Sequence, residues 1–206
     1  MSKLSVDFYQ REDILAISRD LLGKILCTKL DGYITSGIIV ETEAYAGVTD
    51  RASHAYGDRR TQRTEIMYSP GGTSYVYLCY GIHHLFNIVT NVKDTPHAIL
   101  IRAIEPLVGI DIMLKRRNMV KPLSKLTAGP GILSQALGIQ KFHSGISLLG
   151  NKIWIEDNHP SDRSKRSDWY NHTIASPRVG CQYAGKDANN PWRFRIKGNQ
   201  WVSPAK

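Results

Sequence analysis

Cysteine is scarce in this chain of 206 residues, which contains only Cys27, Cys79 and Cys181. These residues are widely separated, odd in number and in no Cys-x-x-Cys pair, which argues against a disulfide scaffold and favours buried, reduced thiols. Long hydrophobic runs are missing as well: no stretch approaches the roughly 18 apolar residues of a membrane-spanning helix. The first residues also contain no apolar segment typical of a signal peptide. We therefore expect a cytoplasmic protein that does not enter a membrane.

Acidic residues are in deficit, with 18 Asp and Glu against 27 Lys and Arg. The resulting net charge of +9 and pI near 9.5 favour a polyanionic partner, although many basic proteins bind no nucleic acid. The hydrophobic fraction of 42% is ordinary for a protein with a packed core. Because this length suits one domain and no repeat or low-complexity segment occurs, we predict a single domain over residues 1–206.

Hydrophobic periodicity predicts a few helices and a larger number of strands. The helices are expected at residues 11–22, 107–117 and 131–137, the last with Pro130 at its start and Gly138 just past its end. The strands are expected at residues 24–30, 34–43, 73–92 (as a hairpin), 97–104 (closed by Pro106), 153–156 and 192–202. Strands that outnumber helices and are joined mostly by turns favour an α+β fold with a largely antiparallel sheet.

Two segments lack a regular pattern. Residues 47–72 are polar, rich in Arg and end in Pro-Gly-Gly, so we predict a long loop, which in a compact domain is usually functional or disordered. A second polar and basic stretch lies between the last two predicted strands, and it contains Arg163, Lys165, Arg166 and Arg178.

Two carboxylates stand at the end of the second predicted strand. Strand alternation places Glu41 and Glu43 on one face, with Ile39, at the point where the chain enters the loop 47–72. The loop supplies arginines at positions 51, 59, 60 and 63, so a carboxylate could orient a water molecule while the arginines hold a phosphate backbone. From the pattern alone, ordinary solvated acids at a strand edge explain the pair about as well.

The hairpin at residues 73–92 is rich in aromatic residues and is expected to turn near Tyr80 and Gly81. Tyr75 and Tyr77 share one face of the strand, where tyrosines are usually core or cross-strand partners. Tyr80 has little to pack against at a hairpin tip, and it could form a wedge of the kind that distorts duplex DNA. A tip that binds another protein remains the alternative.

The histidines and nearby acids raise the question of a metal site, and the candidates are His54, His83, His84, Glu43 and Asp50. Their spacing matches no zinc signature, and adjacent His83 and His84 would point to opposite sides of a strand, so we predict no metal. Arg102, within an apolar strand, is costly unless it is paired. It could form a structural ion pair with Glu41 or another acid, or it could help to hold a water molecule or a phosphate at the same site.

Several segments are distinctive, and in chain order they are residues 39–45 (IVETEAY), 53–55 (SHA), 60–61 (RT), 63, 67, 75–77 (YVY), 80–81 (YG), 87, 100–106 (LIRAIEP), 126–131 (LTAGPG), 177–180 (PRVG) and 191–194 (PWRF). Together they resemble the alkyladenine (3-methyladenine) DNA glycosylase family. The resemblance runs in order from about residue 7 to residue 203, nearly the whole chain. It implies a single α+β domain with a curved, mostly antiparallel sheet flanked by helices and a protruding, DNA-intercalating β-hairpin.

The resemblance also implies roles for individual residues. Glu43 would activate the attacking water, and Arg102 would lie near that water and the sugar–phosphate. Tyr80 would fill the space left by the flipped nucleotide. Tyr45, His54 and Tyr77 would form the aromatic walls of the pocket around the flipped base. Asn87 would stand at the pocket wall and exclude the exocyclic amine of guanine. Val179 would lie near the pocket.

The implied activity is that of a monofunctional DNA glycosylase of base excision repair. It would flip a damaged (alkylated or deaminated) purine out of double-stranded DNA, hydrolyse the N-glycosidic bond and leave an abasic site. The resemblance implies no cofactor and no metal, a monomer, and association with the nucleoid if the source is bacterial.

Departures from the family pattern occur only in the loop and the hairpin, at Thr64, Tyr68, residues 69–72 and residues 83–84. They leave the grip on DNA and the lesion preference open. The residues by themselves also allow a non-catalytic nucleic-acid-binding module, or a carbohydrate glycosidase with Glu41 and Glu43 as its carboxylate pair. The charge of +9 counts against a neutral sugar as substrate.

Overall fold

The longest element of the fold is strand β2 (Tyr33–Tyr45) in the computed structural model, which describes residues 2–158 and 172–204. The other strands are β1 (Ile25–Leu30), β3 (Thr73–Cys79), β4 (His83–Thr90), β5 (His97–Val108), β6 (Ile153–Glu156), β7 (Thr173–Ser176) and β8 (Arg193–Ile196). The α-helices are α1 (Val6–Tyr9), α2 (Ile14–Asp20), α3 (Ile110–Arg116) and α4 (Pro130–Leu137). No helix among the described residues is long and apolar enough to cross a bilayer. The predicted basic positions Arg163, Lys165 and Arg166 lie outside the described residues.

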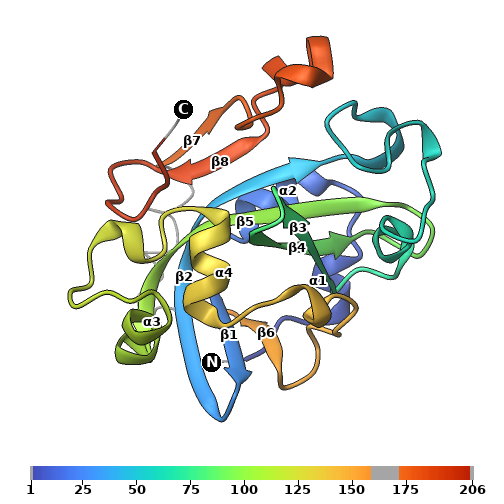
Figure 1. Cartoon of the computed structure of the whole chain (residues 1–206). Helices are drawn as coiled ribbons and strands as arrows, with labels where there is room; N and C mark the ends of the chain where they lie inside the picture. The colour runs from blue at the N-terminus through green and yellow to red at the C-terminus, as the bar shows by residue number, and fades with distance from the viewer. Residues whose placement is uncertain (1, 159–171, 205–206) are drawn as a thin grey trace.

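The described strands form one sheet in which every pairing is antiparallel, in the order β3-β4-β5-β2-β1-β6. One edge of β2 pairs with β5, whereas the other edge pairs with β1 over residues 33–38 and with β8 over residues 41–43. Strand β8 in turn carries β7. This division of β2 between two partners gives the sheet its curl (Figure 1). The predicted α+β class with a curved antiparallel sheet is confirmed.

Helices lie on both faces of the curved sheet, as predicted. Figure 1 shows α4 in front of the strands and α2 behind them. Helix α2 packs on β2 and β5, and its Ser18 hydroxyl donates to the Thr42 hydroxyl at 3.0 Å. Helix α4 packs on β4 and β5 and contributes Leu133 and Leu137 to the main hydrophobic core. The site-bearing strands β2, β4 and β5 are therefore held from both sides.

Two of the helices are shorter than the sequence pattern predicts. The helix predicted at 11–22 begins only after Asp13, because the Asp13 carboxylate accepts the backbone N–H groups of Leu15 and Ala16 and caps α2 there. The helix predicted at 107–117 is α3, which begins at Ile110. The helix predicted after Pro130 is confirmed, with Gly138 in the left-handed conformation as its cap.

Two predicted strand boundaries are also wrong. Strand β5 does not end before Pro106 but continues to Val108, with Pro106 opposite Gly37 of β2. A side chain at position 37 would put its Cβ 2.7 Å from the Glu105 carbonyl oxygen, so glycine is what lets the two strands approach here. The strand predicted at 192–202 is limited to β8, because the chain turns at Gly198, whose φ is +74°.

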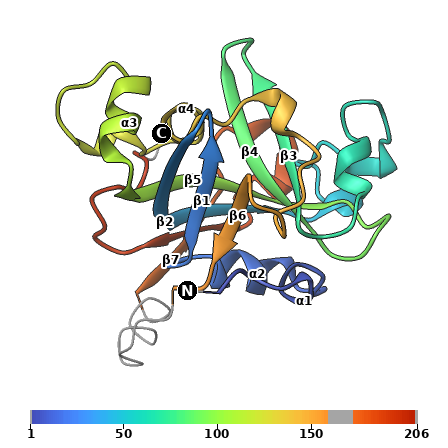
Figure 2. The ribbon, with the colours of Figure 1, turned by 90° about the horizontal axis from the view of Figure 1, so that it is seen from below.

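Residues 47–72 are irregular, as predicted, but they carry short 3-10 turns at Gly47–Thr49, Tyr56–Asp58 and Glu65–Tyr68. The hairpin β3–β4 turns at residues 80–82, since Cys79 pairs with His83. Figure 2 shows its tip extending beyond the rest of the sheet. Tyr80 and Gly81 both have positive φ values, of 52° and 75°, and form the tight turn.

Candidate active site

The acidic segment lies where strand β2 is most irregular. The register between β2 and β5 shifts on both sides of Glu41, so Val40 and Arg102 have no direct partner across the ladder. A bulge of this kind re-aims side chains next to it. As alternation predicted, Glu41 and Glu43 share a face, because both form ion pairs with Arg102. Both carboxylates are fully buried, so the interpretation of solvated acids at a strand edge is wrong.

Glu43 is held by three donors from different parts of the chain. The Val179 backbone N–H donates to its Oε1 at 2.7 Å, and the Tyr45 hydroxyl donates to its Oε2 at 2.8 Å. The Arg102 guanidinium lies 3.3 Å from Oε1. Oε1 thus has two close donors and Oε2 has one, and together they fix the position of the carboxylate. Glu43 also lines a cleft of about 610 Å³, so the buried carboxylate faces a space that a ligand can enter.

Glu41 has a different environment, without an opening to the cleft. Its carboxylate accepts hydrogen bonds from Arg102 Nε at 2.9 Å, Arg193 Nε at 2.6 Å and the Ser203 backbone N–H at 2.7 Å. The Ser203 hydroxyl adds a fourth at 2.9 Å. With its acceptor positions used, Glu41 is the structural partner of two buried arginines. The sequence left open whether Arg102 forms a structural ion pair or reaches the site. In the structure it does both, since it pairs with Glu41 and also lines the cleft.

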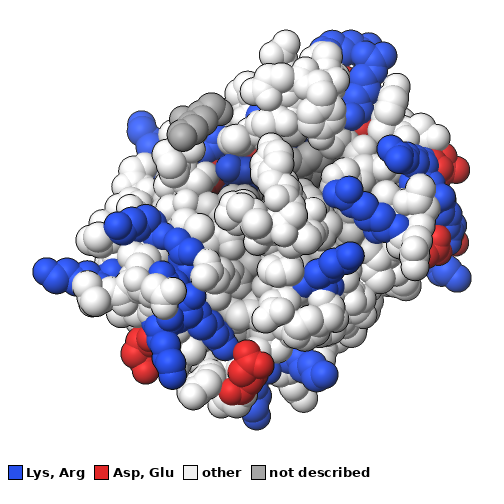
Figure 3. All heavy atoms as spheres, viewed as in Figure 1, with Lys and Arg blue, Asp and Glu red and all other residues white. Residues whose placement is uncertain are grey.

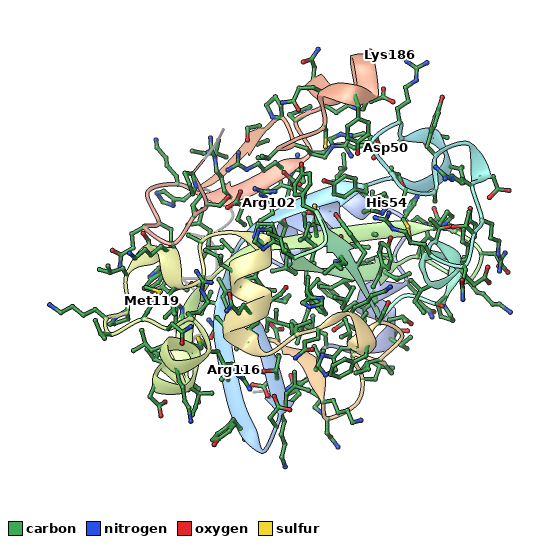
Figure 4. The ribbon with its side chains drawn as sticks, in the orientation of Figure 1. Asp50, His54, Arg102, Arg116, Met119 and Lys186 are labelled. Carbon is green, nitrogen blue, oxygen red and sulfur yellow. The ribbon has the colours of Figure 1, made fainter. Side chains whose placement is uncertain are left out.

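Three aromatic side chains stand next to Glu43 in the cleft. Tyr45, Tyr77 and His54 all line it, and the His54 and Tyr77 rings meet edge to face with centroids 4.7 Å apart. Burial and the neighbouring Glu43 carboxylate raise the pKa of Tyr45 well above its usual value, so its hydroxyl keeps its proton for the hydrogen bond. Burial likewise raises the pKa of Tyr77. Figure 4 labels His54 and Arg102 on the two sides of this region.

His54 is neutral, and its tautomer follows from its partners. The Arg63 guanidinium lies 3.3 Å from His54 Nε2 and can only donate, so Nε2 accepts and Nδ1 donates to the Tyr75 hydroxyl at 2.8 Å. Burial, with Arg63 and Arg59 nearby, lowers the pKa of His54 to about 4. The ring is therefore uncharged near neutral pH.

Asn87 and Val179 lie at the pocket as well. Asn87 is buried and its Nδ2 donates to the carbonyl oxygens of Tyr75 and Leu85, at 3.1 and 3.2 Å, which fixes the orientation of its amide. It lines a small cavity of about 40 Å³ together with Tyr45, His54 and Tyr77. All the residues expected at the site are thus brought together, and their individual roles remain predictions.

Tyr80 stands at the rim of the same cleft. Tyr80 is 90% exposed and Ile82 is 71% exposed, so most of each residue faces solvent. Opposite the hairpin, the cleft is bounded by residues 129–131 at the start of α4, and a Cβ at Gly131 would meet the His83 ring at 2.9 Å. The hairpin and α4 therefore touch through this glycine.

Sequence reasoning missed the groups that support the site from behind. Asp50, considered as a metal ligand, instead forms a buried ion pair with Arg178, whose Nη2 donates to it at 2.8 Å. The same guanidinium donates to the Ala44 carbonyl oxygen at 2.8 Å, next to Tyr45. Arg193 lies in residues 191–194, one of the segments that resemble the family, and this signal could have indicated that it belongs to the site. Ser203 gave no signal, because a serine near the end of a chain is ordinary.

Comparisons with known proteins agree with this arrangement. Residues 7–200 match the model of the methylpurine-DNA glycosylase family. A protein of Chlamydia felis with the provisional name 3-methyladenine DNA glycosylase is 46% identical, over 94% of this chain and 95% of its own length. Proteins with the same provisional name from Chlamydia abortus and Desulfitobacterium hafniense are 47% and 40% identical, over 94% and 98% of this chain and over 97% and 99% of their own lengths.

These matches confirm the family resemblance found in the sequence, and with it the assignment as a DNA glycosylase, a hydrolase of DNA repair. They also overturn the two alternatives left open by the residues, a non-catalytic binding module and a carbohydrate glycosidase. Because a family model and full-length relatives agree, this chain belongs to the methylpurine-DNA glycosylase family.

Proposed function

We propose that this chain flips a damaged purine out of duplex DNA and hydrolyses its N-glycosidic bond with a water molecule activated by Glu43. The observation that carries the proposal is the position of Glu43, a fully buried carboxylate that lines a cleft walled by aromatic rings. A base inside a duplex is out of reach, so chemistry on it requires a pocket that accepts it outside the stack.

Flipping costs on the order of a few kcal/mol, and the hairpin tip is suited to offset that cost. The Tyr80 ring is exposed and can stack in the gap left by the nucleotide, since it has little packing within the protein to lose. The tightly turned backbone at Tyr80 and Gly81 presents the ring at the end of a two-stranded support. The surplus of basic residues serves the phosphate contacts that hold the bent duplex.

The flipped base is expected to stack between Tyr45, His54 and Tyr77, where one aromatic contact contributes about 1–3 kcal/mol. A neutral His54 suits this task, because an alkylated purine such as 3-methyladenine is itself positively charged and would be repelled by an imidazolium. Asn87 is expected to obstruct the exocyclic amine of guanine, and the fixed orientation of its amide, which donates to two backbone carbonyl oxygens, supports this role.

The chemistry builds positive charge on the sugar as the bond to the base breaks. Glu43 stabilises that charge and accepts a proton from the attacking water, a form of base catalysis typically worth about 10²–10⁴-fold. An alkylated base leaves without further help. A neutral base such as hypoxanthine needs a proton donor, and His54 is a weak candidate since its pKa is about 4. We therefore expect alkylated purines to be released faster than deaminated ones.

The reaction is expected to stop at an abasic site. A glycosylase that also cuts the strand uses an amine to form a Schiff base with the sugar. The described lining of the cleft contains no lysine. The enzyme is thus monofunctional, with water as the only nucleophile.

The test compares Glu43→Gln with the wild type on duplexes carrying 3-methyladenine, ethenoadenine or hypoxanthine, followed by alkaline cleavage of abasic sites. The glutamine variant should bind lesion duplex as the wild type does and lose base release by at least about 100-fold. Glu12→Gln, at an exposed acid before α2, is the matched control and should retain full activity. Normal base release by the Glu43 variant would contradict the mechanism.

A further inference from the structure

A basic surface lies outside the cleft, on α3 and the loop after it. Between Asp111 and Glu156 the chain contains no acidic residue at all, yet it contains several lysines and arginines. Four of these basic residues, in the second half of α3 and the chain that follows it, are called the α3 patch: Lys115, Arg117, Lys121 and Lys125. Figure 3 shows Lys and Arg side chains gathered over this part of the molecule.

Within the described part of the chain, no acidic residue neutralises the charges of the α3 patch. Lys115, Lys121 and Lys125 are exposed, and none forms an ion pair with an acid of residues 2–158 or 172–204. Arg116, in contrast, lies 3.7 Å from the Asp31 carboxylate and is not counted in the patch. Unpaired cations that face solvent on one side are the electrostatic footprint of a polyanion partner.

The patch is attached to a wall of the cleft. Arg117 donates to the Gln135 side chain of α4 and to the Lys125 carbonyl oxygen, and Gln135 Nε2 donates back to the Arg116 carbonyl oxygen at 2.9 Å. The first residues of α4 form the cleft wall opposite the hairpin. The loop is therefore held to the element that borders the active site.

The elements that carry the patch and the hairpin tip lie on the same side of the molecule. In Figure 2, α3 and its following loop, helix α4 and the tip of β3–β4 all lie at the upper side of the molecule. Figure 4 labels Met119 on this loop, on the far side of α4 from Arg102. A ligand that lies across the cleft can thus meet the tip and the patch together.

We propose that the α3 patch binds the phosphate backbone of the duplex on one flank of the lesion, beyond the segment held by the hairpin and the pocket. This inference rests on the proposed function, since it takes the cleft as the place of the damaged nucleotide. Each lysine that neutralises a phosphate releases counterions, so the patch contributes affinity that falls as salt rises and does not depend on base sequence. Its role is to lengthen the footprint and to hold the enzyme on undamaged DNA during the search.

The test is the double variant Lys121→Glu/Lys125→Glu, measured by binding to undamaged and lesion-containing duplexes over a range of salt concentrations. Both affinities should fall at low salt, and the slope of log K against log salt should become less steep by about 0.9 for each phosphate that the protein no longer neutralises. The hydroxyl-radical footprint on lesion duplex should shorten on one side only. Base release in single turnovers at saturating enzyme should remain within about twofold of the wild type.

The matched control is Lys93→Glu/Lys197→Glu, which changes the net charge by the same amount. Lys93 lies just after the end of β4 that is remote from the hairpin tip. Lys197 lies just after β8, a strand that pairs first with Glu43 and then with Glu41 of β2 and so leads away from the cleft. An unchanged slope and footprint in the patch variant, or equal losses in the control, would overturn the inference. Neither result tests the proposed function, which is tested separately by measuring base release in the Glu43→Gln variant.

Discussion

The Arg102 Nε donates to Glu41 at 2.9 Å, and this bond determines where the rest of the guanidinium lies. The Nη1 of the same side chain is placed 3.3 Å from Glu43. Glu41 is thus connected to Glu43, the proposed catalytic carboxylate, through Arg102 of the neighbouring strand β5. Glu41 does not itself line the cleft.

Replacing Glu41 with alanine should destabilise the fold strongly. The change leaves Arg102 and Arg193 buried without their carboxylate, and breaking a buried pair by removing one partner typically costs about 3–5 kcal/mol. Urea unfolding at neutral pH measures the effect. Glu105→Ala is the control, because Glu105 is partly exposed and accepts one side-chain hydrogen bond, from Asn199, so its loss should cost about 1 kcal/mol. Equal midpoints for the two variants would contradict the structural role of Glu41.

Replacing Tyr45 with phenylalanine separates the two tasks of this residue. The ring remains available for stacking, but the hydrogen bond to Glu43 Oε2 is removed. A hydrogen bond to a charged group is worth about 1.5–3 kcal/mol, so the single-turnover rate of base release should fall about 10- to 150-fold. Affinity for lesion duplex should stay within about threefold. A loss of affinity with an unchanged rate would show that the hydroxyl serves binding instead.

Replacing Tyr80 with serine should weaken excision from duplex more than from single strands. The wedge matters only where stacking must be broken, and removal of a stacking interaction worth about 1–3 kcal/mol corresponds to roughly a 5- to 150-fold decrease. Tyr33→Ser provides the control, because Tyr33 is an exposed tyrosine beside another hairpin turn, between β1 and β2. Similar losses on both substrates would count against intercalation by the tip.

The stability of the protein should depend on His54 in a defined pH range. Its folded-state pKa is about 4, below the value near 6.5 in the unfolded chain, so the unfolded state binds more protons between these values. The unfolding free energy should therefore fall as pH is lowered from about 6.5 to 4. In His54→Gln this decline should be shallower. His83→Gln, at an exposed histidine of the hairpin, is the comparison; an identical pH dependence in the wild type and His54→Gln would refute the assignment.

Local signals predicted the elements that depend on a few neighbouring residues. Pro130 and Gly138 set the ends of α4, and Asp31 and Gly32, both with positive φ, form the turn between β1 and β2 as expected. The boundaries that failed depend on distant residues. Strand β5 continues through Pro106 because Gly37, on another strand, leaves space for it, and no periodicity within β5 itself contains that information.

The sequence by itself determined the family, the α+β class and the residues gathered at the cleft, because long matched segments and hairpin turns are encoded locally. Only the tertiary structure separated the surroundings of Glu41 and Glu43. Both are buried on one face of β2, but Glu41 is surrounded by Arg102, Arg193 and Ser203, whereas Glu43 belongs to the lining of the cleft. Apart from Tyr45, the partners of the two carboxylates come from strands and loops far away in the chain, and only the packing of the fold brings them together.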